Sequence, residues 1–453
     1  MARSPGIADG ALRILVVGSG GREHAIAWKL AQSRHQPDLI IAPGNAGTAA
    51  LGENVPVSAI DLEGMVALAK ERHVDLVVIG PEAPLAAGLA DRLREAGARV
   101  FGPSAAAAKI ESSKVWAKQL MARHGMPTAP ARSFDDPEKA RAYAASRPEG
   151  SVVIKADGLA AGKGVVIPQT RAETFSAIDS LMISQAAGDA GKKVLIEERL
   201  SGPEVSVFAF VCGESVSAEI AACDYKRVND GDQGPNTGGM GSYTPPEFWT
   251  PELAARVRSR ILIPAARAMV QEGCPFNGVL YAGLMLTDEG PKVIEFNCRL
   301  GDPEAEVVLP RLSSDLVDVC MAIADSQPGK APVKWDERAH VGVVMASGGY
   351  PGKYQNGFPV TGLEEASKDA VVFHAGTKHV PEDQVLTNGG RVLVAVGAGQ
   401  NVAEAREKAY SAVSKISFEG AHYRRDIAER AMGPAGRKII PGADLSGPNE
   451  TGA

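Results

Sequence analysis

The sequence predicts a multidomain protein in which an N-terminal parallel α/β domain is followed by regions of the α+β class. The chain has 453 residues, enough for about two to four domains with a sizeable core. Short apolar strands alternate with amphipathic helices over residues 12–103, a β-α-β pattern that is typical of a parallel sheet. Beyond about residue 132, hairpin patterns replace this alternation and indicate antiparallel strands.

The elements of the first region follow from its apolar runs. Strands are expected over 13–17, 39–42, 75–79 and 99–101, and helices over 24–32, 62–71 and 85–96. A further helix over 112–124 leads out of this domain, because Gly125 and Pro127 end it. His24 is expected to begin its helix rather than to act in catalysis.

The loop Gly18-Ser19-Gly20-Gly21 follows the first strand and opens a helix. A dinucleotide-binding loop would need a third glycine where Glu23 stands. It would also need an acidic residue at the end of the second strand, where the chain reads Ile41-Ala42-Pro43. The loop therefore suits one phosphate at a helix N-terminus better than it suits NAD.

Residues 152–167 place two β-branched runs on either side of a glycine-rich loop, which is typical of a β-hairpin with a long tip. Glycine backbone N–H groups can close over an anion, and lysines supply point charges for phosphate. Lys155 and Lys163 are therefore candidate phosphate ligands. No Walker loop is present, because no Gly-x4-Gly-Lys-Ser/Thr opens a helix here. A flexible hairpin tip with solvated lysines fits the same residues.

Residues 293–297 read as a strand in which Glu295 and Asn297 point to one face, while Ile294 and Phe296 point to the other. A carboxylate and an amide oxygen two residues apart suit a hard divalent cation that also binds substrate phosphates. The alternative is an exposed polar edge. The apolar frame of the strand favours the metal site.

The composition excludes several classes of protein. A net charge of −6 and the lack of any Lys/Arg-rich block argue against nucleic acid as a partner. No apolar run approaches the roughly 18 residues of a membrane span, and the N-terminus does not read as a signal peptide. The five cysteines are scattered without a Cys-x2-Cys pair, which indicates a reducing, cytoplasmic location and no zinc site.

Four domains are predicted, with boundaries at 12–131, 132–200, 201–335 and 336–432. The last contains strands over 341–345, 371–373 and 392–396 and a helix over 402–416. Residues 1–11 and 436–453 are expected to be disordered, the second because it is rich in glycine and proline.

Four further motifs accompany the two segments described above. They are Gly-Ser-Gly-Gly-Arg-Glu-His-Ala (18–25), Ala-Pro-Gly-Asn-Ala-Gly-Thr (42–48), Gly-Pro-Glu-Ala-Pro-Leu (80–85) and Gly-Pro-Asn-Thr-Gly-Gly-Met-Gly (234–241). From about residue 12 to about residue 432 the chain resembles the phosphoribosylamine–glycine ligase family, the glycinamide ribonucleotide synthetases of the ATP-grasp superfamily. The resemblance implies an ATP-grasp core, with a lid subdomain over 132–200 and a larger subdomain bearing magnesium over 201–335, followed by a C-terminal α+β domain.

The resemblance also implies an activity in de novo purine biosynthesis. This is the ATP-dependent ligation of glycine to 5-phosphoribosylamine, giving glycinamide ribonucleotide, ADP and phosphate through glycyl phosphate. ATP and Mg²⁺, or alternatively Mn²⁺, are the implied cofactors, and the protein is expected to be a monomer or a weak homodimer. The route needs no protein nucleophile, in agreement with the lack of a Ser-His-Asp or Cys-His pattern.

Roles for individual residues follow from the same resemblance. The implied ATP-binding residues are Lys114, Lys155, Gly162, Lys163, Gly164, Glu197, Glu198, Leu200 and Glu204, and the implied metal ligands are Glu295 and Asn297. The strand over 280–286 lacks the further carboxylate that many ATP-grasp enzymes place there, so a second ion lacks a ligand on that strand.

The substrate residues lie in other segments. In the polar loop 224–243, Asp224 is expected to bind the ammonium group of glycine, and Arg299 is expected to bind an anionic group as the second catalytic residue. A surface loop with weak local ion pairs is the alternative for this segment. Gly20, Gly21, Asn45 and Glu82 lie at strand ends, where parallel sheets bind ligands, and are candidates for binding phosphoribosylamine.

Two other functions fit part of the pattern. One is a different ligase of the same fold, such as a purine-pathway carboxylase, which the loop 224–243 and the motif 80–85 oppose. The other is a nucleotide sensor without activity, which would be expected to lack Lys155, Glu295 or Asn297.

Overall fold

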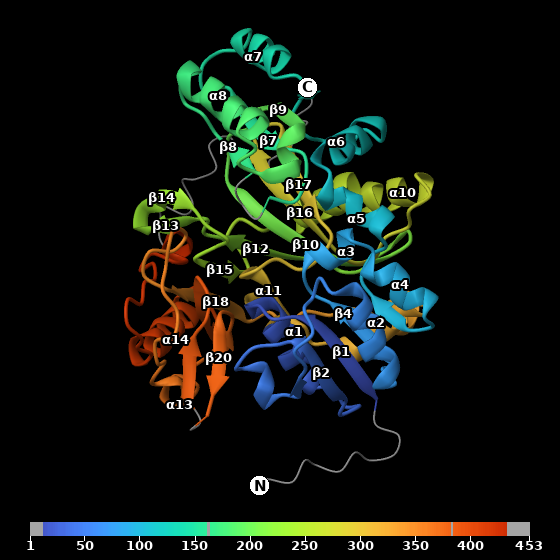
Figure 1. Ribbon diagram of the computed structural model, residues 1–453, viewed down its shortest axis with the longest axis vertical. Helices are drawn as coiled ribbons and strands as arrows, with labels where there is room; N and C mark the ends of the chain where they lie inside the picture. Colours follow the sequence, from blue (N-terminus) through green and yellow to red (C-terminus); the bar gives the residue numbers. More distant parts are fainter. Residues whose placement is uncertain (1–11, 161–163, 382–383, 433–453) are drawn as a thin grey trace, which may run out of the picture.

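The computed structural model describes residues 12–160, 164–381 and 384–432. Three parts are visible in Figure 1. A small α/β module stands at the top, the blue N-terminal sheet lies at the lower right, and the orange and red C-terminal elements lie beside it. The predicted disordered ends, 1–11 and 436–453, and the predicted ligands Gly162 and Lys163 lie outside the described residues.

The N-terminal sheet is parallel throughout, with the strand order β3-β2-β1-β4-β5. Its strands are β1 (Arg13–Gly18), β2 (Asp38–Pro43), β3 (Glu53–Asn54), β4 (Leu76–Ile79) and β5 (Arg99–Phe101). Its helices are α1 (Gly21–Ala31), α2 (Leu62–Glu71), α3 (Glu82–Ala86) and α4 (Leu89–Glu95), and α5 (Ala105–Ser112) and α6 (Lys114–Arg123) lead out of it. The parallel α/β prediction is confirmed.

Two helix predictions in this region need correction. The helix expected over 85–96 is divided, because Gly88 adopts a φ of +88° between α3 and α4. The helix α1 begins at Gly21, so His24 lies inside the first turn and does not begin the helix. α5 was not predicted at all.

The small module contains the glycine-rich hairpin. Its antiparallel sheet has the order β6-β9-β7-β8, formed by β6 (Ala131–Phe134), β7 (Val152–Ala156), β8 (Val165–Val166) and β9 (Val194–Glu198). Helices α7 (Pro137–Ala145) and α8 (Arg171–Ile178) cover it. β7 pairs with β8 on either side of the glycine-rich loop, which confirms the predicted hairpin.

A nine-stranded sheet forms the centre of the molecule and crosses the predicted boundary at residue 335. Its main path runs β17-β16-β10-β12-β15-β18-β22-β19, and the neighbouring strands along it are antiparallel. The bounds are β10 (Glu204–Cys212), β11 (Ser215–Val216), β12 (Ile220–Asp224), β15 (Gly241–Thr244), β16 (Asn277–Thr287), β17 (Gly290–Asn297), β18 (Ala339–Ala346), β19 (Val371–His374) and β22 (Arg391–Gly399). The pairing of β15 with β18 therefore joins the C-terminal region to the central sheet.

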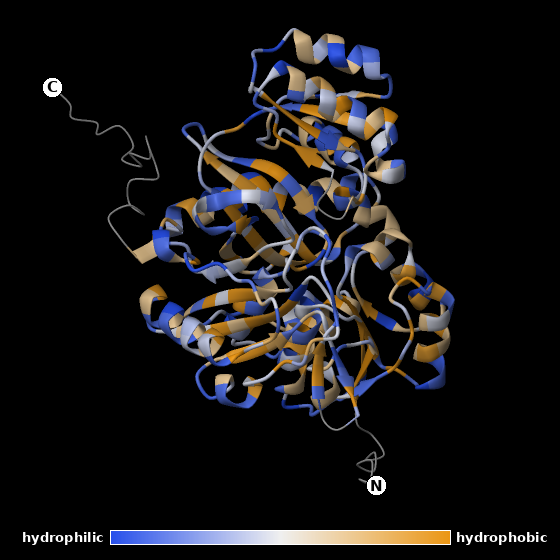
Figure 2. Cartoon of the chain, turned by 60° about the vertical axis from the view of Figure 1, so that its left-hand side comes forward, coloured by the Kyte–Doolittle hydropathy of each residue, from blue (hydrophilic) through white to orange (hydrophobic). Residues whose placement is uncertain are grey.

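The remaining elements cover this sheet or extend from it. They are the hairpin strands β13 (Arg227–Asn229) with β14 (Gln233–Asn236) and β20 (Thr377–Val380) with β21 (Gln384–Thr387), and the helices α9 (Pro251–Val257), α10 (Ile263–Gln271), α11 (Glu304–Val308), α12 (Leu316–Ala324), α13 (Leu363–Ala366) and α14 (Val402–Lys415). Figure 2 shows apolar residues concentrated on the strands and polar residues on outward helix surfaces. Among the described residues, no helix is both long and apolar enough to cross a membrane.

Candidate active site

One cavity of about 1110 Å³ lies between the small module, the central sheet and the C-terminal region. Most of the predicted site residues line it. They are Glu82, Lys114, Lys155, Gly164, Glu197, Glu198, Leu200, Glu204, Asp224, Glu295, Asn297 and Arg299. Residues more than 200 positions apart in the sequence are thus brought to one site.

Two lysines meet one carboxylate beneath the hairpin. Lys155 Nζ lies 3.1 Å from Glu197 Oε1 and donates a hydrogen bond to the Ile294 carbonyl at 3.0 Å. Lys118 Nζ lies 3.2 Å from Glu197 Oε2. All three side chains are buried, and burial lowers the pKa of Lys118 to about 8 against the raising effect of Glu197. The result is a buried group with one net positive charge at neutral pH, next to the cavity.

The lysine at the start of α6 contacts the glycine-rich loop. Lys114 Nζ donates to the Gly158 carbonyl at 3.2 Å. Ser113 caps the N-terminus of α6, because its hydroxyl accepts from the Trp116 N–H, and the hydroxyl also donates to Asp157 Oδ1 at 2.9 Å. The loop is therefore attached to α6 at the edge of the cavity, with Lys114 between them.

The predicted metal ligands lie on β17, on the wall between the two ends of the cavity. Glu295 is half-buried and Asn297 is buried. Burial alone would raise the pKa of Glu295, but the positive charges of Lys114, Lys155 and Lys226 lower it. Within the described residues, the Glu295 carboxylate forms no hydrogen bond or ion pair, so its oxygens remain available to a ligand.

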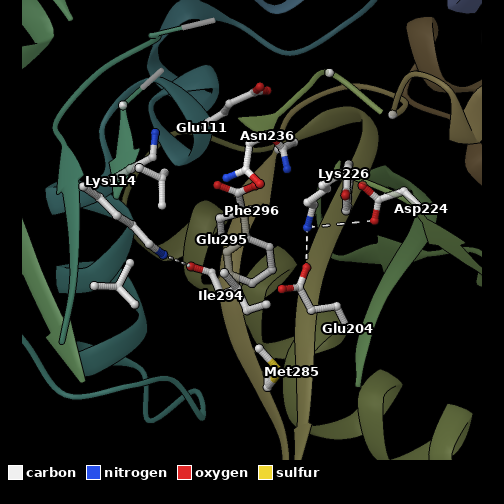
Figure 3. Close-up of a pocket in the computed structure, with 18 of the residues that line it drawn as sticks. Glu111, Lys114, Glu204, Asp224, Lys226, Asn236, Met285, Ile294, Glu295 and Phe296 are labelled. Atoms are coloured by element: carbon white, nitrogen blue, oxygen red, sulfur yellow. Dashed lines mark hydrogen bonds and ion pairs between the residues drawn. The ribbon is translucent and has the colours of Figure 1, made fainter. Parts of the chain in front are cut away.

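Strict alternation does not hold at this strand. Gly283 pairs with Glu295 and Leu284 pairs with Val293, so Ile294 is an extra residue in β17. Ile294 and Phe296 both line the cavity (Figure 3), although Phe296 is buried and also packs in the core. The expectation that these two side chains point away from the site is therefore wrong, and for Ile294 the extra residue in β17 is the reason.

A cluster of charged side chains lies at the end of the cavity opposite Lys114. Figure 3 shows Glu204, Asp224 and Lys226 grouped on one side, Lys114 on the other, and Glu295 between them. Lys226 forms an ion pair with Glu204, and its Nζ lies 3.9 Å from Asp224 Oδ1. Burial raises the pKa of Asp224 to about 7, with Glu304 and Glu204 adding to the effect and Lys226 opposing it.

Arg299 joins the turn after β17 to the N-terminal domain. Its Nη2 donates to Glu111 Oε1 at 2.8 Å, and its Nε donates to Glu82 Oε2 at 3.2 Å. Burial would raise the pKa of Glu82, but Arg299 and Arg22 hold it at about 2. Burial would likewise lower the pKa of Arg299, but Glu111 and Glu82 raise it. The guanidinium is therefore fixed and charged.

Three of the predicted substrate residues do not line this cavity. Gly20 and Gly21 lie at the start of α1, where the Gly20 N–H donates to Glu23 Oε2 at 2.7 Å. The Asn45 side chain donates to the carbonyls of Ser19 and His374, at 2.9 and 2.8 Å, and accepts from the Gly47 and Thr48 N–H groups. Asn45 therefore connects the loops that follow β1 and β2 to His374 in the C-terminal region.

His24 is structural. Its Nδ1 accepts from the His374 N–H at 2.7 Å, and burial lowers its pKa to about 3. The imidazole is neutral at physiological pH and serves to attach α1 to β19.

Several cavity residues were not predicted. Lys118 lies four residues after Lys114 on the same helix face, and this i, i+4 spacing was the available signal. Asp302, Glu304, Tyr350 and Arg391 also line the cavity. Arg391 Nη1 lies 3.0 Å from Asp302 Oδ1 and donates to the Gly238 carbonyl at 2.8 Å, so the C-terminal region forms part of the wall.

Models of phosphoribosylglycinamide synthetase match the chain in three parts: the N domain over 12–111, the ATP-grasp (A) domain over 112–305 and the C domain over 340–430. The phosphoribosylamine–glycine ligase of Halalkalibacterium halodurans is 49% identical over 423 residues, covering 93% of this chain and 97% of the relative. That of Vibrio parahaemolyticus is 47% identical over 426 residues, covering 93% and 99%.

Solved structures show the same relationship. The phosphoribosylamine–glycine ligase of Thermotoga maritima superposes with a TM-score of 0.81 at 37% identity, covering 92% of this chain and all of that one (100%). A biotin carboxylase from Campylobacter jejuni superposes with a TM-score of 0.70 at 15% identity, covering 96% and 98%. At that identity the second likeness concerns the fold alone.

Proposed function

The chain belongs to the phosphoribosylglycinamide synthetase family, and from this premise we infer that it joins glycine to phosphoribosylamine with ATP as the energy source. It is an ATP-grasp carboxylate–amine ligase of purine biosynthesis. The main support for this inference is the sequence identity of 49%, over 93% of this chain, to the phosphoribosylamine–glycine ligase of Halalkalibacterium halodurans. The cavity agrees with it, because its charged residues come from all three matched domains.

The chemistry explains the need for ATP. A carboxylate does not react with an amine at neutral pH, because oxide is a poor leaving group. Transfer of the γ-phosphoryl group to the glycine carboxylate forms an acyl phosphate, from which phosphate leaves readily. The amine of phosphoribosylamine then attacks the carbonyl carbon, and glycinamide ribonucleotide, ADP and phosphate result. The protein aligns the reactants, neutralises charge and excludes water.

Lys114 and Lys155 are proposed to bind the phosphate groups of ATP. Lys155 lies beside the buried Glu197, and Lys114 contacts the glycine-rich loop, so both cations are placed before nucleotide binds. Gly164 and the sequence-predicted Gly162 and Lys163 would close over the phosphates. Backbone groups at Glu198 and Leu200 would contact adenine, and Glu204 would contact ribose.

ATP-grasp enzymes use a divalent metal, and we propose Mg²⁺, with Mn²⁺ as a substitute. Glu295 and Asn297 would hold it, since a carboxylate kept ionised by nearby lysines and an amide oxygen are ligands that suit a hard cation. The metal would neutralise charge on the transferring phosphoryl group.

Asp224 and Arg299 are proposed to orient glycine. The Asp224 carboxylate would bind the ammonium group, and Arg299 would bind the negative charge that develops on the carboxyl group and on phosphate. Glu82, paired with Arg299, would position phosphoribosylamine together with Gly20, Gly21 and Asn45 at the ends of the parallel strands.

Three properties of the whole molecule are proposals as well. We propose a cytoplasmic location, supported by five buried, free cysteines. We also propose a monomer or weak homodimer that acts without nucleic acid or membrane. Sedimentation at several protein concentrations would test the state of association.

The test of the function is ADP release with phosphoribosylamine generated in situ. Release that requires both glycine and phosphoribosylamine is expected. Release that requires bicarbonate and ignores glycine would indicate a carboxylase, and a protein that binds ATP without release would indicate a sensor.

A further inference from the structure

A buried arginine in the C-terminal region holds the segment that carries Asp224, the proposed glycine ligand. Arg424 is fully buried, and its guanidinium forms a two-point contact with Asp426: Nε to Oδ1 at 2.8 Å and Nη2 to Oδ2 at 2.6 Å. Its Nη1 donates to Asp232 Oδ1 at 2.8 Å and to the Arg227 carbonyl at 3.0 Å. One side chain thus connects residues about 200 positions apart.

Further contacts extend this attachment along the two segments. The His422 ring lies 2.8 Å from the Val228 carbonyl, the Arg425 N–H donates to Asp230 Oδ1 at 2.7 Å, and the Gly231 N–H donates to Asp426 Oδ2 at 2.9 Å. In Figure 1 the red C-terminal segment lies directly beside the β13–β14 hairpin. Residues 422–428 therefore act as one support for residues 225–232.

Tyr225 transmits the support to the cavity. The guanidinium groups of Arg424 and Arg430 lie over its buried ring, 4.7 and 4.5 Å from the ring centroid, and its hydroxyl accepts from the Ala428 N–H at 2.9 Å. Asp224 and Lys226, the residues on either side of it, line the cavity. These three contacts hold the ring and thereby the backbone from which both charged side chains project.

We propose that Arg424 is a positioning residue for glycine: through Tyr225, Arg227 and Asp232 it sets where Asp224 and Lys226 lie in the cavity. The role rests on the proposed function, because it assigns glycine to Asp224. Arg424 does not line the cavity, so its effect on glycine is indirect. The proposed phosphate ligands, Lys114 and Lys155, come from other elements. ATP would meet this support only through Glu204, which pairs with Lys226, so ATP binding should depend on it less than glycine binding does.

The test compares Arg424→Met with Arg425→Met, which alters the exposed neighbouring arginine. Since small misplacements of reacting groups carry large penalties, Arg424→Met is expected to lower kcat/KM for glycine by roughly 10- to 100-fold while the dissociation constant for ATP changes much less. Arg425→Met should match wild type in both measurements. Equal losses in kcat/KM for glycine and in affinity for ATP would indicate that Arg424 only stabilises the fold, which would contradict the proposal. An unchanged kcat/KM for glycine would also overturn it.

A milder second variant tests the same contact in case Arg424→Met does not fold. Asp426→Asn keeps the size of the side chain and one acceptor oxygen, while Asp232 still pairs with Arg424. A smaller loss in the same direction, in a protein with a cooperative unfolding transition, is expected. Normal glycine kinetics in both variants would contradict the proposal. Wild-type protein without glycine-dependent ADP release would contradict the function itself, so the two failures are distinguishable.

Discussion

Lys155 and Glu197 form a buried ion pair, with Nζ 3.1 Å from Oε1, and Lys118 contacts the other oxygen of the same carboxylate. A single buried pair would be neutral. The second lysine leaves a net positive charge beside the cavity, where the phosphate groups of ATP are expected. The arrangement explains how a buried lysine can be placed for an anion before the anion arrives.

Replacement of Lys155 by methionine should weaken ATP binding. Loss of a charge-assisted contact costs about 1.5–3 kcal/mol, or roughly 10- to 150-fold in affinity. Calorimetry with ATP measures the change, and Lys139→Met, at an exposed lysine of the same module, is the control. Equal affinity in the Lys155 variant and the control would remove Lys155 from the site.

Replacement of Glu295 by glutamine should raise the concentration of magnesium needed for half-maximal activity and lower turnover. The variant keeps the shape of the side chain but loses the charge that suits a hard cation. Glu289→Gln, on the exposed turn of the same hairpin, is the matched control. A magnesium titration that superposes on that of the control would contradict the assignment.

Glycine binding should depend on pH through Asp224, whose pKa is raised to about 7 by burial. Only the ionised carboxylate attracts an ammonium group, so KM for glycine should fall as pH rises from about 6 to 8. Ionisation of the Asp224 carboxyl group should, in contrast, lower the stability of the folded protein. The pKa of Asp224 in the folded protein is above the value of about 3.9 in the unfolded chain. The contribution of this group to the free energy of unfolding is therefore complete below about pH 3.9 and is lost as the pH rises through about 7.

The variant Asp224→Asn separates these effects. It should bind glycine weakly at every pH and show a smaller fall in melting temperature between pH 5 and pH 8 than wild type. A glycine KM in wild type that does not change over this range would argue against Asp224 as the ammonium ligand.

The glycine-rich loop should act as a lid. Its described part is attached through the contact between Lys114 and the Gly158 carbonyl, and β8 is two residues long, so local opening is expected to be easy. Amide hydrogen exchange at Gly158–Ala160 and Gly164 should slow when ATP is added, whereas α2 should not change. Equal exchange with and without ATP would indicate a passive hairpin.

Local patterns predicted most of the strands near the site. The hairpin β16–β17 follows from apolar runs around a turn at Asp288-Glu289-Gly290, and Gly290 has the positive φ that such a turn requires. The break at Gly88 has a comparable local cause, but a glycine inside a helical pattern does not by itself reveal its φ. The extra residue at Ile294 depends on the partner strand and was not predictable from β17 alone.

Long-range pairing explains the remaining differences. The pairing of Gly241 with Val343 joins strands about 100 residues apart, so the continuity of the central sheet across residue 335 was not visible in the sequence. The contacts of Arg391 with Gly238 and of Arg424 with Asp232 likewise join residues far apart in the sequence, so they were not visible in it either. Lys118 is different, because its i, i+4 spacing from Lys114 within a helix is visible in the sequence.

Glycine labelled in its carboxylate group distinguishes activation as glycyl phosphate from every other route to the amide. If the γ-phosphoryl group is transferred to the glycine carboxylate, one carboxylate oxygen must leave on the phosphate. Glycine labelled with heavy oxygen in its carboxylate should therefore give inorganic phosphate that carries one labelled oxygen per turnover, as mass spectrometry would show. Unlabelled phosphate released in step with amide formation would contradict the acyl phosphate route, even if the product were glycinamide ribonucleotide.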